Sequence, residues 1–171
     1  MLETERLIIK PLNYSQLLKY IKCDSSLEEE LQLLNNARTI SAELKEALEQ
    51  TILINVENHP QTYLFHTLWT AISKSENKMV GDLCIVGEPN EEGEVEIGYG
   101  TYDEFQNKGY MTETVGAVIS WLNTHDKVKA IIASTEKANT ASFKVLEKNH
   151  FIKIGETETQ FNWCLRKELI S

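Results

Sequence analysis

The sequence is poor in cysteine, with only three among 171 residues, at Cys23, Cys84 and Cys164. An odd number of cysteines at wide spacing, without a C-x-x-C pair or a nearby histidine cluster, does not make a disulfide framework or a zinc site. No base or orienting carboxylate adjoins any of them, which argues against a catalytic thiol. We therefore expect reduced thiols, no metal ion and a cytoplasmic protein.

Long apolar stretches and an excess of positive charge are also absent. The sequence has no run of about 18 apolar residues and no cationic leader followed by an apolar segment, so we expect neither secretion nor membrane spanning. Basic residues number 17 against 26 acidic ones, for a formal charge of −9. Such a surface repels phosphate backbones and anionic lipid, and we expect no nucleic acid and no membrane partner. A cationic acceptor such as an amine would be attracted.

The rest of the composition is that of an ordinary globular protein. Apolar residues make up 42% of the sequence and charged residues 25%, and no repeat or low-complexity tract interrupts it. A length of 171 residues falls within the range of one compact unit. We therefore predict a single domain over residues 1–171.

Hydrophobic periodicity predicts a mixed α/β fold. Strands are expected at residues 6–10, 63–73, 79–86, 94–102, 128–134, 151–157 and 161–167, where β-branched and aromatic residues gather or alternate. Helices are expected at residues 14–21, 41–56, 109–124 and 139–148, with Ser41 as an N-cap of the second. The helix at 109–124 joins two strands as a parallel crossover. Ligands of such sheets bind at the carboxyl ends of strands, which directs attention to residues 102–112.

The junction between the strand at 94–102 and the next helix has the features of an anion site. The N–H groups at a helix start are unpaired and favour negative charge, and Gly109 lets a ligand approach the backbone closely. These groups can cradle a pyrophosphate, with Lys108 adding charge. A glycine-assisted helix start beside an ordinary exposed lysine fits the same spacing, and the residues alone leave both interpretations open. The junction reads Gln106-Asn107-Lys108-Gly109-Tyr110-Met111-Thr112.

Several segments, in the expected order, resemble the GNAT superfamily of N-acetyltransferases. Gln106-x-x-Gly109-x-Met111 is similar to its Q/R-x-x-G-x-G/A acyl-CoA pyrophosphate loop, and Gly98-Tyr99-Gly100 stands where the family has a β-bulge. Four segments resemble the branch that includes the ribosomal-protein N-alpha-acetyltransferases. They are the T-E-R-L start at residues 4–12, V-E-I-G-Y at 95–99, G-Y-M-T-E at 109–113, and N-x-x-S followed by L-E-K at 139–151. Together these segments span nearly the whole chain.

The resemblance implies the GNAT fold, an acyl-CoA N-acyltransferase architecture. Its central sheet is mixed and mostly antiparallel, with helices on both faces and a V-shaped splay between the fourth and fifth predicted strands. Acetyl-CoA is expected to bind in the splay as co-substrate, with backbone groups of Tyr99 and Thr101 pairing with the pantetheine arm. The implied cofactor-binding residues are Tyr99, Thr101, Gln106, Asn107, Lys108, Gly109, Tyr110, Met111, Thr112, Asn139, Ser142 and Phe143.

The sequence departs from the family pattern at three places. Met111 replaces a small residue of the loop, and Asn149-His150 replaces a glycine-containing pair, but neither change removes a backbone donor. Leu146 stands where many relatives carry a tyrosine that protonates the departing thiolate. Ser142 is therefore the candidate for that proton donor.

Attack of a neutral amine on a thioester needs a proton acceptor and an oxyanion donor as well. By the same resemblance Glu96 is the candidate base, acting directly or through water, although a solvent-facing strand glutamate fits its position equally well. A backbone N–H near Tyr99 or Thr101 is the expected oxyanion donor. His66, on a neighbouring predicted strand, is expected to be structural rather than catalytic, and Trp69, Trp121 and Trp163 are expected in the core.

The predicted function is acetyl-CoA-dependent transfer of an acetyl group to a primary amine, without a covalent intermediate. The acceptor implied by the branch is a peptide or protein N-terminal α-amine, while a polyamine, an antibiotic or another small amine stays open, and a homodimer is compatible with the branch. The alternative is an acyl-CoA-binding sensor or interaction module with little or no turnover, which the missing tyrosine motivates. A nucleotide-binding protein is a third interpretation, but the loop lacks G-x-x-x-x-G-K-[ST] spacing.

Overall fold

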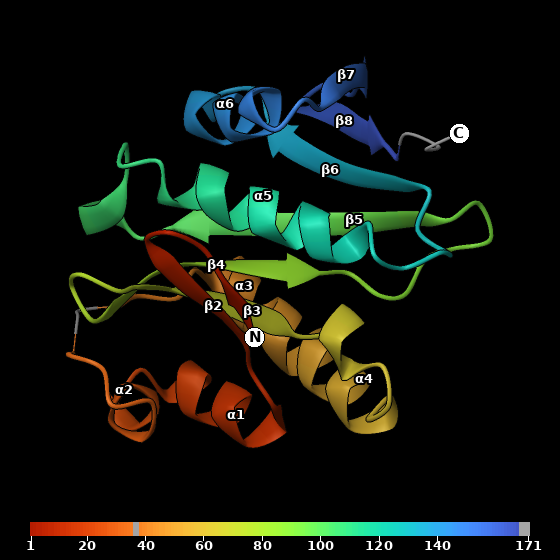
Figure 1. The fold of residues 1–171 in the computed structure, drawn as a ribbon. Coiled ribbons are helices and arrows are strands. Elements are labelled where there is room, and N and C mark those ends of the chain that lie inside the picture. The colour runs from red at the N-terminus through yellow and green to blue at the C-terminus, as the bar shows by residue number, and fades with distance from the viewer. Residues whose placement is uncertain (36–37, 168–171) are drawn as a thin grey trace.

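The computed structural model describes residues 1–35 and 38–167. These residues form an eight-stranded sheet in the order β1-β2-β3-β4-β5-β6-β8-β7, in which every neighbouring pair is antiparallel except β5 and β6 (Figure 1). The strands are β1 (Leu2–Glu3), β2 (Leu7–Pro11), β3 (Leu68–Ser73), β4 (Lys78–Ile85), β5 (Glu94–Thr101), β6 (Ala130–Glu136), β7 (Ile152–Glu156) and β8 (Gln160–Arg166). The predicted mixed α/β class and its parallel crossover are confirmed.

Helices cover the sheet on both faces. They are α1 (Tyr14–Lys22), α2 (Ser26–Glu30), α3 (Ala42–Ala47), the π-helix η1 (Leu48–Ile52), α4 (Leu53–Asn58), the 3₁₀ turns η2 (Tyr63–Phe65) and η3 (Asp103–Phe105), α5 (Tyr110–Leu122) and α6 (Thr140–Lys148). Figure 1 shows α1–α4 gathered beside β2–β4, α5 lying along β5, and α6 beside β7 and β8. The crossover from β5 to β6 therefore runs through α5.

Two hydrophobic clusters hold the layers together, one on each face. The larger packs α5 and α6 on the sheet through fully buried residues such as Val115, Val118 and Leu146. The smaller packs the N-terminal helices on β3 and β4 through residues such as Leu17 and Leu48. Burial of one aliphatic side chain stabilises a fold by about 1.5–3 kcal/mol, so both clusters contribute strongly to the free energy of unfolding.

The N-terminal helices follow from local signals. Asn13 caps α1 in a capping box, since its side chain accepts from the Gln16 N–H while the Gln16 side chain accepts from the Asn13 N–H. Ser41 accepts from the Leu44 N–H, as predicted for the second helix. That helix is not one regular segment, because a π-helical turn separates α3 from α4.

The segment before β3 differs from the prediction. Residues 63–67 were expected in a strand, but Tyr63–Phe65 form the turn η2 and the strand begins at Leu68. Trp69 Nε1 donates to the Leu64 carbonyl over 3.0 Å, and the Gly87 N–H donates to the Phe65 carbonyl over 2.8 Å, so these residues are tied into a turn. The two-residue strand β1 and the one-turn helix α2 were not predicted either.

The splay of the sheet lies between β5 and β6. Residues 94–96 of β5 pair with residues 130–132 of β6, and beyond them β5 continues beside β4 while β6 continues beside β8. The β4–β5 register runs without a shift from Ile97 to Thr101, so the bulge expected at 98–100 is not present there. The Tyr102 N–H donates to a carbonyl of β4, and the Glu96 carbonyl accepts from the N–H of the residue that follows β4. Because the backbone groups of successive strand residues point to opposite sides, those of Tyr99 and Thr101 point away from β4, toward the splay.

Candidate active site

A cleft of about 400 Å³ opens where β5 and β6 separate. That volume is within the range of small-molecule sites. Three segments line it: the end of β5, the loop into α5 with the first residues of that helix, and one side of α6 along its length. Its residues are Tyr99, Gly100, Thr101, Phe105, Gln106, Asn107, Gly109, Tyr110, Met111, Thr112, Asn139, Ala141, Ser142, Lys144, Val145 and Lys148.

The loop into α5 is shaped to present backbone N–H groups to this cleft. Asn107 has φ of 60° and Gly109 has φ of 77°, and Gly109 is the N-cap of α5 without a side-chain cap. Left-handed residues next to a helix start turn successive N–H groups to one side and leave those of the first turn free. The N–H groups of Tyr110, Met111 and Thr112 are therefore free at the positive end of α5, an arrangement that can bind an anion.

The N-terminal hairpin supports this loop from outside the cleft. Arg6 Nη1 donates to the Lys108 carbonyl over 2.9 Å, and Arg6 Nε donates to Glu113 Oε2 over 2.7 Å. Thr4 donates to the other oxygen of Glu113 over 2.6 Å. Burial opposes ionisation of Glu113, but the bonds from Thr4 and Arg6 and the Arg6 charge outweigh it and lower the pKa of this carboxyl. The acidic residue in the first turn of α5 is thus neutralised by a cation.

The cations of the cleft differ from those predicted. Lys108 does not line it, since its Nζ lies 3.7 Å from Glu76 and over the ring of Phe105. Lys144 and Lys148 line it from the opposite wall. The two lysines are four residues apart and therefore share one helix face, so the sequence itself indicated a second basic wall. The family motif does not include these positions.

The first turn of α6 lies opposite Tyr99. Asn139 caps this helix by accepting from the Ser142 N–H over 3.1 Å. The Tyr99 hydroxyl donates to the Ser142 carbonyl over 2.7 Å, so a side chain of β5 reaches α6 across the cleft. Burial raises the pKa of Tyr99 well above its usual value.

Phe143 and Leu146 face away from the cleft. The ring of Phe143 stacks on Trp163 with a centroid distance of 6.1 Å and meets Phe161 edge-on at 5.9 Å, which differs from the expected contact with the cofactor. Leu146 is fully buried in the larger cluster. Of the predicted cofactor residues, all except Lys108 and Phe143 line the cleft.

Glu96 lies near the narrow end of the splay. It is exposed, and it alternates on β5 with the buried Val95 and Ile97, so its side chain leaves the sheet on the face opposite α5. It does not line the cleft. On the same face, a Cβ atom at Gly100 would have no other atom within 4 Å, so the space above the strand is open there.

A buried polar group lies on that face behind the cleft. Asp82 of β4, directly opposite Gly100 in the register, accepts hydrogen bonds from Tyr20 over 2.6 Å and from Tyr102 over 2.5 Å. Burial raises the pKa of Asp82, and the bonds from Tyr102 and Tyr20 oppose that shift. Tyr102 is thereby fixed at the residue where β5 passes into the loop.

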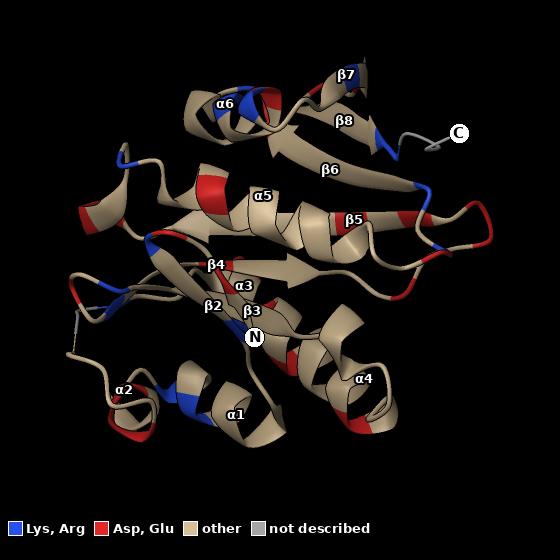
Figure 2. Cartoon of the chain, in the orientation of Figure 1, with Lys and Arg blue, Asp and Glu red and all other residues tan. Residues whose placement is uncertain are grey.

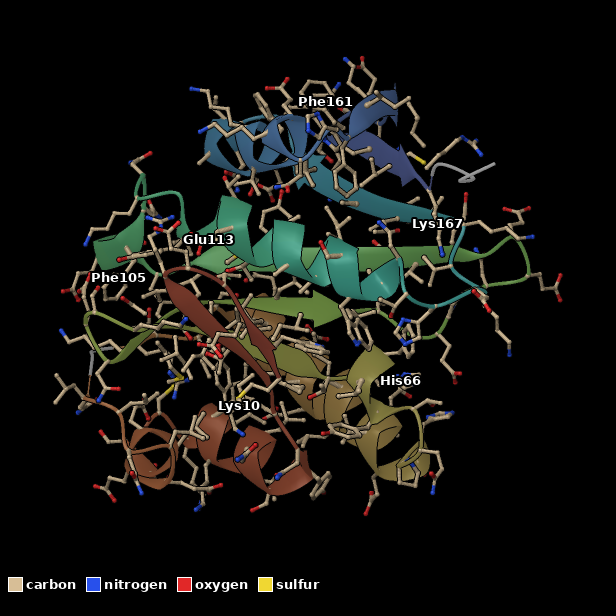
Figure 3. The ribbon with its side chains drawn as sticks, viewed as in Figure 1. Lys10, His66, Phe105, Glu113, Phe161 and Lys167 are labelled. Atoms are coloured by element: carbon tan, nitrogen blue, oxygen red, sulfur yellow. The ribbon has the colours of Figure 1, made fainter. Side chains whose placement is uncertain are left out.

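His66 is remote from the cleft. It follows the turn η2 rather than lying on a strand, its ring stacks on His59 at 4.5 Å, and its Nε2 lies 3.7 Å from Glu88. Figure 3 shows it at the opposite end of the molecule from Phe105 and Glu113. Burial and the neighbouring His59 lower the pKa of His66. Trp69 and Trp163 are buried as predicted, and Trp121 packs on Trp69 at the edge of the larger cluster.

Two further properties concern the described part of the chain. Within residues 1–35 and 38–167, no cluster of three or more His, Cys, Asp or Glu side chains is arranged to hold a metal ion. None of the helices in these ranges has the length and apolarity needed to cross a bilayer.

Comparison with known proteins gives consistent matches over nearly the whole chain. A family model described as an acetyltransferase (GNAT) domain matches residues 6–152. A relative from Bacillus subtilis (strain 168), described as the uncharacterized N-acetyltransferase YjdG, is 30% identical over 163 residues, which cover 95% of this chain and 96% of the relative.

Solved structures share the architecture at lower identity. The ribosomal-protein-S5-alanine acetyltransferase from Vibrio fischeri superposes with a TM-score of 0.70 at 20% identity, covering 96% of this chain and 94% of the other. RimL, a ribosomal L7/L12 alpha-N-protein acetyltransferase solved in complex with coenzyme A, superposes with a TM-score of 0.66 at 18% identity, covering 95% of both chains. At these identities the structures establish the shared fold.

Proposed function

Because the chain belongs to the GNAT acetyltransferase family, we propose that it transfers the acetyl group of acetyl-CoA directly to a primary amine, with residues 1–171 acting as one catalytic unit. The observation that carries the proposal is the cleft of about 400 Å³ between β5 and β6. It joins an anion-binding helix start to a strand edge with free backbone groups, which are the two features that a pyrophosphate and a pantetheine amide need.

The residues of the cleft fit such a co-substrate. The N–H groups of Tyr110, Met111 and Thr112 would bind the pyrophosphate, and Lys144 and Lys148 supply positive charge from the other wall. Backbone groups of Tyr99 and Thr101 would bind the amides of the arm. The thioester supplies an activated acetyl group at the end of that arm.

The protein has three tasks in the transfer. The nitrogen forms a bond to the acetyl carbon as the C–S bond breaks, so one proton must leave the amine and one must reach sulfur. We propose that Glu96, through water, accepts the proton that leaves the amine. The Ser142 hydroxyl donates the proton that reaches sulfur and regains one from water. A backbone N–H of Tyr99 or Thr101 would stabilise the oxyanion. Leu146, being fully buried and apolar, takes no part.

The proposed acceptor is the α-amine of a peptide or protein. Two observations support a cationic acceptor approaching the sheet face that carries Glu96: the open space above Gly100 and the formal charge of −9. The choice of a peptide N-terminus rests on the sequence segments that resemble the ribosomal-protein branch, since solved structures described as a ribosomal-protein acetyltransferase and as a spermidine N-acetyltransferase share the fold equally well.

Calorimetric titration of acetyl-CoA tests the location of the co-substrate. We expect binding to the wild type, loss of binding in Gly109→Trp, whose side chain would project at the loop, and roughly tenfold weaker binding in Lys144→Glu. Lys144 is exposed, so its variant keeps the test decisive if Gly109→Trp misfolds. Lys127→Glu changes the same charge outside the cleft and should bind like the wild type. A folded wild type that does not bind acetyl-CoA contradicts the proposal.

Release of free thiol tests turnover. Acetyl-CoA would be offered with a peptide panel, a polyamine and an aminoglycoside, and with an N-acetylated peptide as the blocked control. We expect release with free N-termini and none with the blocked one. Saturable binding without release on any acceptor would instead support the alternative function of an acyl-CoA-binding sensor. The buried Leu146 favours this alternative, because it stands where many relatives carry the tyrosine that protonates the departing thiolate.

A further inference from the structure

The hydrogen bond from Tyr99 to Ser142 spans the splay at the point where the sheet is open. Tyr99 lies three residues beyond the last β5 residue paired with β6, and its hydroxyl donates to the Ser142 carbonyl over 2.7 Å. Both residues line the cleft. The bond therefore links the strand that would hold the arm of the co-substrate to the helix that carries the candidate proton donor.

Ser142 is held through its backbone and free at its side chain. Its N–H donates to Asn139 Oδ1 over 3.1 Å, and its carbonyl accepts from Tyr99. The Ser142 hydroxyl itself makes no hydrogen bond with any residue in the described ranges 1–35 and 38–167. A serine fixed in this way points an uncommitted O–H from a defined place on the cleft wall.

Tyr99 is suited to hold Ser142 under all ordinary assay conditions. Its ring packs against the larger hydrophobic cluster, so the hydroxyl has little freedom to move elsewhere. Burial raises the pKa of this hydroxyl, which keeps it protonated and able to donate well into alkaline solution. The Tyr99 hydroxyl can therefore donate to the Ser142 carbonyl throughout the pH range of ordinary assays.

We propose that Tyr99 is the positioning residue for Ser142, holding the first turn of α6 at the distance from β5 at which the serine hydroxyl reaches the departing sulfur. This inference rests on the proposed function, in which Ser142 donates the proton that sulfur gains as the C–S bond breaks. Tyr99 does not exchange a proton with the substrate. It acts through the position of Ser142.

The first experiment is a double-mutant cycle on turnover. Tyr99→Phe keeps the ring and removes only the hydroxyl. We expect kcat to fall about five- to tenfold, the loss typical of one hydrogen bond, while the Kd for acetyl-CoA and the acceptor KM change less than twofold. Ser142→Ala should lower kcat further, and the double variant should equal Ser142→Ala, because the tyrosine has no effect once its target group is gone.

Tyr20→Phe is the matched control. It likewise removes one tyrosine hydroxyl that donates a hydrogen bond, in this case to Asp82 over 2.6 Å, at a buried site outside the cleft. We expect it to lower the melting temperature and leave kcat unchanged. A merely structural role for Tyr99 predicts the same behaviour, so an unchanged kcat in Tyr99→Phe overturns the inference. A double variant whose loss is the product of the two single losses overturns it as well.

Hydrogen exchange separates this inference from the proposed function. In Tyr99→Phe we expect faster exchange of the backbone amides in residues 140–145 than in the wild type, and no such change in Tyr20→Phe. Equal exchange in that turn contradicts the positioning role even if the wild type proves inactive. If Ser142→Ala keeps full kcat while Tyr99→Phe shows the faster exchange, Ser142 is not the proton donor, but the hydrogen bond from Tyr99 still fixes the first turn of α6.

Discussion

Under the proposed function, the acceptor approaches the sheet face that carries Glu96. We predict that Glu96→Gln lowers kcat for a peptide acceptor about a hundredfold, the usual contribution of a general base, and leaves the Kd for acetyl-CoA unchanged. Steady-state kinetics and calorimetry measure the two quantities. Glu94→Gln is the control, since Glu94 lies two residues away on the same strand and the same face. Equal kcat in both variants would identify Glu96 as a solvent-facing strand residue.

Asp82 predicts a pH dependence of stability. Because burial raises its pKa above the usual 3.8, the folded protein holds this proton more tightly than the unfolded chain does, and the associated stability is lost as pH rises from about 4 upward. We therefore predict that the free energy of unfolding of the wild type falls with pH relative to that of Asp82→Asn, which carries no titrating group there. Urea unfolding at several pH values measures this difference. Parallel pH profiles for the two proteins would contradict it.

At the scale of elements, the hairpin of β1 and β2 and the start of α5 form one unit. The T-E-R and G-Y-M-T-E segments are far apart in sequence, yet Thr4 and Arg6 hold Glu113, and Arg6 also holds the Lys108 carbonyl. Figure 3 shows Glu113 at the end of α5 that adjoins Phe105. The physical meaning of the paired motifs is that the hairpin fixes the conformation of the loop into α5.

Arg6→Ala should therefore act on binding more than on stability. We predict a three- to tenfold higher Kd for acetyl-CoA, about one lost hydrogen bond, with only a small drop in melting temperature, because a half-exposed ion pair contributes little to folding. Calorimetry and thermal denaturation measure these effects. Lys74→Ala removes an ion pair with Glu3 and a bond to the Thr4 carbonyl on the same hairpin, without touching the loop. The prediction fails if both variants weaken acetyl-CoA equally.

The longer elements and the loop were predictable from sequence because their signals are local. Caps such as Ser41 and helical or alternating periodicity depend on neighbours within a few residues. Very short elements such as α2, and the turn at residues 63–65, depend on tertiary hydrogen bonds that leave no periodic pattern. Sequence reasoning therefore erred mainly where the chain is fixed by contacts from distant segments.

Side-chain directions in the cleft show the same limit. The motif located the loop, but it did not reveal that Lys108 turns to Glu76 while Lys144 turns to the cleft. The sequence showed that His150 replaces a glycine of the family pattern, but it did not show how the end of α6 would be formed without that glycine. His150 adopts φ of 66° after α6, and its N–H and that of Phe151 bond back to Glu147 and Leu146, so a non-glycine residue completes the helix end.

At the scale of the whole molecule, charge is unevenly distributed. Figure 2 shows acidic residues on α2, α4 and the loop before β5, basic residues on α1, and both kinds on α6. With a formal charge of −9, the protein should attract cationic acceptors over a distance that salt shortens.

We predict that kcat/KM for a lysine-containing peptide, measured at saturating acetyl-CoA, falls several-fold when ionic strength rises from about 0.03 M to about 0.3 M. A peptide with the same first residue and glutamates in place of the lysines serves as the control, and its kcat/KM should stay constant or rise. An identical salt response for the two peptides would show that the net charge does not steer the acceptor.

The open seam between β5 and β6 has a consequence for the life of the protein in a cell. Two portions of the sheet are joined by the pairing of residues 94–96 with residues 130–132, and the arm of acetyl-CoA would fill the remaining seam. A ligand that binds only the folded form adds about 2.7 kcal/mol to the free energy of unfolding at a hundred times its Kd. Resistance to proteolysis should then rise and fall with the acetyl-CoA concentration, and under the proposed function the amount of enzyme would follow the supply of its co-substrate.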